Sequence, residues 1–143
     1  MSVVEQFSYS ERNPASPGLE LMPDLPVVLH HQSHALACMG LVDSGATISV
    51  LPYSLGVQLG FDWNTQKTPI ILAGTLANVD ARGIVVEAAI GQLSRVRLAL
   101  AWAASDQVPF LFGQFNFFQV FDVCFFRTRG VFEIRQPGAA SSP

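Results

Sequence analysis

The sequence predicts an all-β fold, either a small barrel or a sandwich, with one or two short helices. Three observations lead to this class. The apolar runs have the length of strands, turn-forming residues separate them, and few segments space their apolar residues as a helix does. The chain has 143 residues, half of them hydrophobic, which is enough for one domain with a buried core. We see no internal repeat.

Each expected strand is an apolar, often β-branched run bounded by turn-forming residues. The runs "LPVVLHH" and "ALACMGLVDSG" flank the polar turn "QSH" and predict a hairpin, and "DVCFF" and "VFEIR" predict another around "RTRG". In chain order the expected strands are 25–31, 35–45, 49–52, 68–74, 83–91, 96–104, 108–113, 122–126 and 131–135.

Two segments are expected to be helical, and two to lie outside the folded domain. Residues 53–60 carry Leu at helical spacing and end in Gly, and residues 114–121 carry Phe at helical spacing. Residues 1–23 are rich in Ser, Pro, Asn and Glu without a clear period, so we expect a flexible N-terminal arm. The folded domain is then 24–136, and 137–143 is expected to be a disordered tail.

Charge and hydropathy argue against several classes of function. The formal net charge is −3 and only 13% of the residues are charged, so we expect no nucleic-acid partner. No apolar run reaches the length of a membrane span, and the N-terminus lacks the pattern of a signal peptide. We therefore expect a cytoplasmic protein with no membrane partner. Cys38 and Cys124 lie in apolar runs and are expected to be buried free thiols.

The stretch "LVDSGATISVLP" is the most informative part of the sequence. Asp43 follows two aliphatic residues that end a strand, and it precedes a tight turn that contains Gly45. A carboxylate in this position is partly desolvated, and hydrogen bonds or a partner charge must offset that cost. Asp43 therefore either caps a turn or takes part in chemistry.

These residues resemble the retropepsin-like aspartic proteases, whose signature is an apolar pair followed by Asp-Thr/Ser-Gly-Ala. Here the signature is Leu41, Val42, Asp43, Ser44, Gly45 and Ala46, and a second one, two apolar residues and a Gly before a short helix, is Leu111, Phe112 and Gly113. The resemblance covers roughly residues 25–135 and is strongest to bacterial members. It implies a closed, barrel-like acid-protease fold with one half of the active site per chain, and neither a cofactor nor a metal.

The resemblance also assigns roles to single residues. Asp43 becomes the catalytic carboxylate, Ser44 braces the active-site loops across a dimer, and the Gly45 amide donates to a carboxylate. The other expected support residues of the active-site loop are Ala46, Leu111, Phe112 and Gly113. A flap is expected within "LAGTLANVDARG", and its substrate-binding residues are Gly74, Thr75, Leu76 and Ala77.

The chemistry of this family requires two carboxylates that share one proton, one acting as base and the other as acid. The chain has one Asp-Ser-Gly, so the enzyme must be a C2 homodimer with one Asp43 from each chain. Viral members often have an Asp after the Ala and an Arg after the second Gly. Here Thr47 or Ile48 and Gln114 occupy those places, which removes an intersubunit salt bridge. The Phe-rich hairpin 122–135 is the expected alternative dimer surface.

Our interpretation is an aspartic endopeptidase that cleaves peptide or protein substrates. The alternative is a catalytically silent relative that serves as a dimerisation or peptide-binding module, because fold alone does not determine activity. His30, His31 and His34 could bind a metal, but a polar hairpin turn fits "HHQSH" better. Cys124 is expected to be packed rather than nucleophilic, because no His lies near it in sequence.

Overall fold

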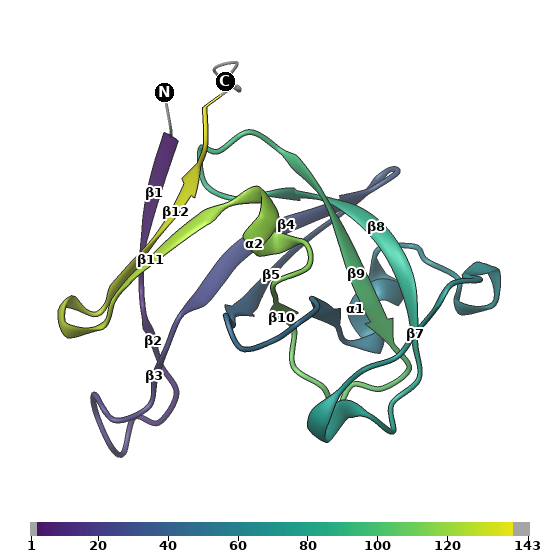
Figure 1. Ribbon diagram of the computed structural model, residues 1–143, viewed down its shortest axis with the longest axis horizontal. Helices are drawn as coiled ribbons and strands as arrows, with labels where there is room; N and C mark the ends of the chain where they lie inside the picture. The colour runs from purple at the N-terminus through teal and green to yellow at the C-terminus, as the bar shows by residue number, and fades with distance from the viewer. Residues whose placement is uncertain (1–2, 139–143) are drawn as a thin grey trace.

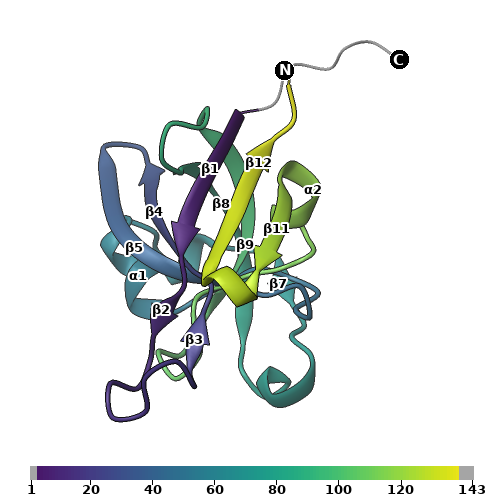
Figure 2. The same cartoon turned by 90° about the vertical axis from the view of Figure 1, so that its left-hand side faces the viewer.

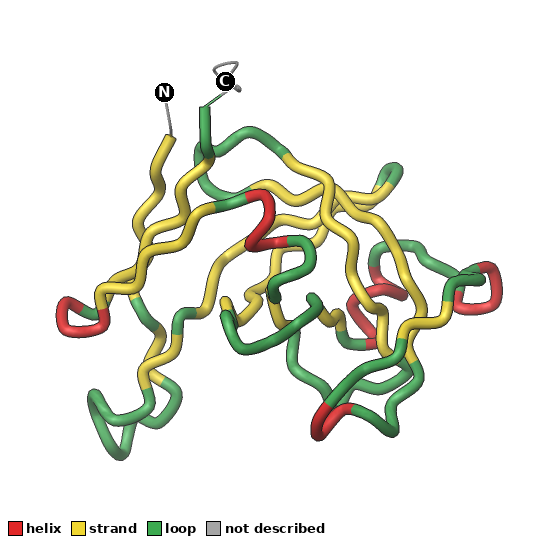
Figure 3. Tube along the Cα trace, in the orientation of Figure 1, coloured by secondary structure: helices red, strands yellow, loops and turns green. Residues whose placement is uncertain are grey.

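The structure is a computed structural model that describes residues 3–138. Strands dominate it, and the helices are short (Figure 1, Figure 3). The strands are β1 (Val3–Ser8), β2 (Ser10–Glu11), β3 (Leu21–Met22), β4 (Asp24–His31), β5 (His34–Val42), β6 (Val50–Leu51), β7 (Pro69–Ile70), β8 (Ala81–Ala89), β9 (Val96–Ala103), β10 (Leu111–Phe112), β11 (Asp122–Phe126) and β12 (Val131–Gln136). The helices are α1 (Tyr53–Gln58) and α2 (Phe117–Val120), with single 3-10 turns η1 (Trp63–Thr65), η2 (Gly74–Leu76) and η3 (Arg127–Arg129).

Six strands close into a barrel. Their order is β4-β5-β10-β6-β9-β8, and a second pairing between β4 and β8 closes the ring, while β7 adds to the outer edge of β8. The hairpins β4–β5 and β8–β9 form most of the wall. Along β4 and β8, buried residues largely alternate with more exposed ones, as expected for strands with one face on the core. In β4, for example, Leu25, Val27 and Leu29 are buried. The all-β class and the closed barrel are thus as the sequence predicts.

A second sheet packs against the barrel. Its order is β1-β12-β11, all antiparallel, so the N-terminal strand lies beside the last strand of the domain (Figure 2). The central strand β12 buries Phe132 and Ile134 completely, and Phe7 packs on Phe132 with ring centroids 5.6 Å apart. This sheet therefore belongs to the folded domain.

The interior contains two apolar clusters. The larger fills the barrel and includes Trp102, Phe112 and Phe117, which are fully buried. The smaller lies at the end of the barrel where β5 stops. Its buried members are Val50, Leu72, Ala81, Ala101, Ala103, Val108 and Leu111. This second cluster supports the site described below.

The described part of the expected flexible arm, residues 3–23, is largely built into the domain. Residues 3–8 form β1, and β2 pairs with β3, so the expectation is wrong for these strands. Their partners lie far along the chain or across a loop, which leaves no local periodic signal. The expected tail falls mostly on residues 139–143, which lie outside the described residues.

Some element boundaries also differ from expectation. The strand expected at 68–74 shortens to β7, because the chain turns away at Ile71 and forms η2. The helix expected at 114–121 is limited to α2, since the backbone amides of residues 114 and 115 donate to carbonyls of the loop 43–49 instead. Among the described helices, none is both long and apolar enough to cross a bilayer.

Candidate active site

Strand β10 lies between two strands that one loop connects. β5 ends at Val42, residues 43–49 form the loop, and β6 begins at Val50. Leu111 of β10 pairs in parallel with Leu41 of β5 and in antiparallel fashion with Val50 of β6. The loop must therefore pass over the end of β10, and Asp43 is its first residue.

The first turn of this loop is held by Asp43 itself. Its backbone amide donates to the carbonyl of Phe112 at 3.0 Å, and its carbonyl accepts from the amide of Ala46 at 3.1 Å. Its Oδ1 accepts from the amide of Gly45 at 2.9 Å. The side chain is half-buried, whereas Ser44 and Gly45 are exposed. Asp43 is thus a turn-capping residue, and its other carboxylate oxygen accepts no hydrogen bond within the described residues.

Gly113 makes the close contact between the loop and β10 possible. Its amide donates to Oγ of Ser49, a buried side chain, at 2.9 Å. A Cβ at this position would lie 2.5 Å from the carbonyl oxygen of Ile48 and 2.8 Å from that of Ala46. Because both neighbours are backbone atoms, any side chain here would displace the loop. Ser49 therefore supports the loop after Asp43, a contact that no local pattern in the sequence indicates.

Gln114 forms a second clamp on the loop. Its backbone amide donates to the carbonyl of Ala46, and its side-chain Nε2 donates to the carbonyl of Ser44, both at 2.8 Å. The next amide, of Phe115, donates to the carbonyl of Thr47 at 3.0 Å. From the sequence, Gln114 is notable only because viral retropepsin-like proteases often have an Arg at this position. Its role here is to tie the Asp-Ser-Gly turn to the segment that leads into α2.

A cavity of about 310 Å³ opens between Asp43 and the η2 turn. Its lining residues are Asp43, Gly45, Ala46, Thr47, Ile48, Val50, Leu72, Ala73, Gly74, Thr75, Leu76 and Leu111. The expected flap residues Gly74, Thr75 and Leu76 therefore face the carboxylate, although they lie about thirty residues further along the chain. Ala77 does not line this cavity and instead borders a neighbouring hollow with Trp63 and Arg82.

The other expected support residues take different places: Gly45, Ala46 and Leu111 line the cavity, whereas Ser44, Phe112 and Gly113 do not. Leu111 faces the cavity, whereas Phe112, the next residue in the strand, lies in the main core, where its ring packs at a tilt against that of Phe117. Ser44 lies on the outside of the turn and does not line the cavity. The walls are mostly aliphatic, and among residues 3–138 Asp43 is the only ionisable side chain that lines the cavity. The cavity can thus hold an apolar side chain next to one carboxylate.

The histidines and cysteines offer weaker candidates for a metal site or for a nucleophile. Within residues 3–138, no three His, Cys, Asp or Glu side chains gather into a metal site. His31 stacks on Phe61 with ring centroids 3.8 Å apart, and burial, followed by the charge of His34, lowers the pKa of His31. Burial raises the pKa of the Cys38 thiol to about 11, so it is protonated at neutral pH and a poor nucleophile. Both cysteines are free and half-buried.

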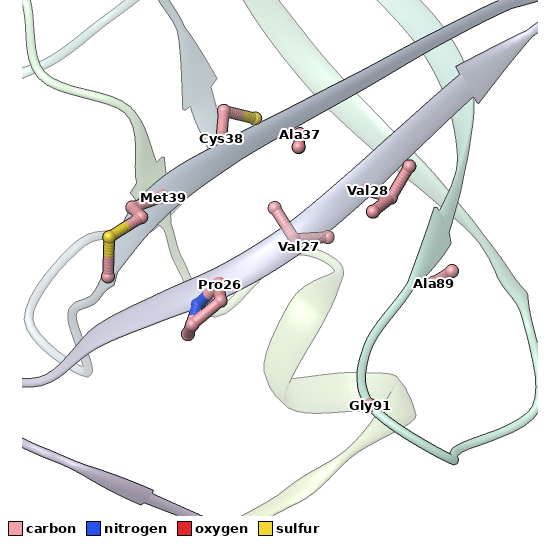
Figure 4. A pocket seen from close by; sticks show the side chains of 8 residues that line it. All are labelled: Pro26, Val27, Val28, Ala37, Cys38, Met39, Ala89 and Gly91. Carbon is pink, nitrogen blue, oxygen red and sulfur yellow. The ribbon is translucent and has the colours of Figure 1, made fainter.

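A somewhat larger groove of about 410 Å³ lies on the outer side of β4 and β5 (Figure 4). Its lining residues are Pro26, Val27, Val28, Ala37, Cys38, Met39, Ala89 and Gly91. Figure 4 shows that these side chains are apolar apart from the Cys38 thiol, so the groove offers no acid or base for catalysis. The smaller cavity at Asp43 is therefore the better candidate active site.

Comparison with known proteins supports the fold. No protein-family model matches the sequence, and no curated protein matches it. The structure is similar to the crystal structure of a retropepsin-like aspartic protease from Rickettsia conorii, with a TM-score of 0.61. The match covers 95% of this chain and 94% of that chain at 15% sequence identity. At this identity the likeness establishes a retropepsin-like fold, and activity must be argued from the site.

Proposed function

We propose that this protein is an aspartic endopeptidase. The observation that carries the proposal is the position of Asp43: it lies at the end of a barrel strand, in a cavity whose opposite wall is the segment Gly74–Leu76. One carboxylate and the segment that we propose as a lid therefore border the same space. This arrangement supports hydrolysis of a peptide bond by a water molecule that carboxylates activate.

One Asp43 is not sufficient for this reaction. A single carboxylate cannot take a proton from water and at the same time donate one to the substrate carbonyl. Two carboxylates at close distance share one proton, because two like charges there cannot both ionise freely. We therefore propose that two chains pair about a twofold axis, so that each contributes Asp43 to a common site.

Exposed apolar side chains near the cavity support a second chain there. Phe115 is 50% exposed beside the Asp-Ser-Gly turn, and Ile71 is 93% exposed where the chain enters the flap. Large apolar side chains with this exposure next to a candidate site are expected to be covered when the site is complete. We propose that the dimer surface centres on residues 43–47 and Phe115.

We expect the hairpin 122–135 to contribute less to a dimer surface than its composition predicts. Phe132 and Ile134 lie in the core of the protomer itself, so they are not free to contact a second chain. Phe125, which is 40% exposed, is the large apolar side chain that the hairpin leaves most accessible. Deleting the hairpin would therefore unfold the protomer rather than simply separate two protomers.

Peptide cleavage tests the proposal. We expect the protein to cleave peptides with apolar residues at the scissile bond, because the cavity walls are aliphatic. A transition-state mimic for aspartic proteases should inhibit the reaction. The rate should have an optimum on the acid side of neutral and fall on both sides, because catalysis needs one ionised and one protonated carboxyl. Binding of the inhibitor without cleavage would instead indicate a silent peptide-binding module.

Replacing Gln114 by Glu tests the clamp on the active-site loop. Glu has nearly the same shape but cannot donate to the carbonyl of Ser44, so the turn loses one hydrogen bond and gains a repulsion. We expect the rate to fall roughly fivefold, the equivalent of about 1 kcal/mol for one such bond. Gln119→Glu is the matched control, since Gln119 is an exposed residue of α2. Equal rates for both variants would show that the side-chain bond from Gln114 to Ser44 does not contribute to catalysis.

A further inference from the structure

The segment before β4 is attached to the barrel. β1 runs along β12, and the chain then passes through the hairpin β2–β3 straight into β4 (Figure 2). The backbone amide of Arg12 donates to the carbonyl of Glu20 at 2.9 Å and so closes the loop of this hairpin. The hairpin therefore holds Arg12 in a defined position next to the start of β4.

Arg12 forms a two-point ion pair with Asp24, the first residue of β4. Its Nε donates to Oδ2 at 2.9 Å, and its Nη2 donates to Oδ1 at 2.5 Å. Within residues 3–138, Asp24 is the only charged residue that is buried, with 9% exposed. The hydrogen bond to Asp24 raises the pKa of Arg12. A guanidinium that binds both oxygens fixes the orientation as well as the charge of a carboxylate.

Asp24 lies directly opposite the end of β5. In the β4–β5 ladder it pairs with Leu41, and the neighbouring carbonyl of Pro23 accepts from the amide of Val42 at 3.0 Å. Leu41 and Val42 are the two residues before Asp43. The backbone at Pro23 and Asp24 thus supports one edge of the strand that carries the catalytic carboxylate.

The opposite edge of this strand has a separate support. The amide of Leu41 donates to the carbonyl of Phe110 at 2.9 Å, and that of Asp43 donates to the carbonyl of Phe112 at 3.0 Å. These bonds come from the barrel and involve no residue of the N-terminal segment. The end of β5 is consequently held between two supports, one of which is anchored by Arg12.

We propose that Arg12 is a positioning residue for Asp43. Its guanidinium fixes Asp24, Asp24 fixes the start of β4, and β4 fixes the last residues of β5. The N-terminal segment is then part of the active-site support and not a removable arm. The effect on catalysis rests on the proposed peptidase function, whereas the effect on the backbone at Val42 does not.

Amide hydrogen exchange measured by NMR tests the proposed effect of Arg12 on the backbone at Val42. In Arg12→Ala we expect the Val42 amide to exchange about tenfold faster relative to the amides of the β8–β9 ladder, because one support of the strand end is loosened. Dividing the Val42 exchange rate by the rates in the β8–β9 ladder corrects for any general loss of stability in the variant. In the same variant we expect kcat to fall about tenfold with KM within about twofold, because the cavity walls are intact.

Two further variants separate positioning from charge burial. Arg12→Ala with Asp24→Asn leaves no unpaired buried carboxylate, so stability should recover, yet Val42 should still exchange faster because no guanidinium holds position 24. Arg12→Lys keeps the charge without the two-point geometry and should give an intermediate exchange rate. Val42 exchange equal to wild type in the double variant would overturn the proposal.

Arg127→Ala is the matched control, because it also removes an arginine that contacts the β2–β3 hairpin. Arg127 donates to the carbonyl of Gly18 in the β2–β3 loop at 3.2 Å but does not contact Asp24. In Arg127→Ala the Val42 amide should exchange as fast as in wild type. An increase in the Val42 exchange rate as large as in Arg12→Ala would also overturn the proposal. If the wild type cleaves no peptide, the exchange results still decide the role of Arg12, so failure of the two proposals can be distinguished.

Discussion

Peptide cleavage by Asp43→Asn protein should be at least about 100-fold slower than by wild type, the lower end of what a positioned acid–base group contributes. The amide of Asn keeps an oxygen that can accept from Gly45, so the turn that Asp43 caps should persist. What is lost is the ionisable group, and a dimer of this variant has no base to activate water. The measurement is kcat/KM on one peptide at the optimal pH of the wild type.

Asp122→Asn is a suitable control for this experiment. Asp122 is an exposed carboxylate at the start of β11, and its replacement makes the same chemical change away from the cavity. Its rate should stay within about twofold of wild type, as for most surface substitutions. Comparable circular dichroism and melting temperatures would show that all three proteins are folded. Undiminished cleavage by folded Asp43→Asn protein would refute the assignment of Asp43 as the catalytic residue.

Replacing Gly113 by Ala should cause a large loss of protein stability. The new methyl group would lie 2.5 Å from the carbonyl oxygen of Ile48, and that backbone cannot move without shifting the loop after Asp43. Overpacking of this kind costs about 3 kcal/mol, which should lower the melting temperature by roughly 10 °C. Activity should fall even in the folded fraction, because the same loop carries the carboxylate.

Gly83→Ala is the matched control, as Gly83 lies in β8 of the same barrel. A Cβ there would lie 3.6 Å from the nearest atom of Ile70, an ordinary van der Waals distance. Its melting temperature and activity should be close to those of wild type, within about 0.5 kcal/mol of unfolding free energy. Differential scanning calorimetry of the two variants makes the comparison, and equal melting temperatures would show that the loop adapts to a side chain at Gly113.

Much of the barrel could be predicted because its strands carry their own signal. In β4 and β8, buried and exposed residues alternate in sequence, and turn-forming residues mark the ends. The Asp-Ser-Gly turn is also local, since the bond from Gly45 to Asp43 spans only two residues. The resemblance to retropepsin-like proteases then added what no local pattern contains: that Leu111 would pack beneath the turn and Gly74 to Leu76 would face it.

The missed features depend on partners distant in sequence. β1 pairs with β12 at the other end of the domain, and its own residues show no clear alternation of apolar and polar side chains. Arg12 follows Glu11 in a Pro-rich segment, and no local pattern links it to Asp24 until the hairpin brings the two together. The resemblance predicts that Ala77 belongs to the flap, but Ala77 follows the 3-10 turn and lines the neighbouring hollow instead of the cavity at Asp43. Such outcomes depend on tertiary contacts rather than local propensity.

A subunit-mixing experiment tests most directly whether two chains share one active site. Wild-type protein is kept at a fixed concentration, at which sedimentation shows dimer, and a ninefold excess of Asp43→Asn protein is added and allowed to exchange. Because mixed dimers have one carboxylate, activity should fall to about one tenth, the fraction of wild-type chains. The same excess of Asp122→Asn protein should not lower it. Undiminished activity after complete exchange with Asp43→Asn protein would contradict a site built from two Asp43 residues.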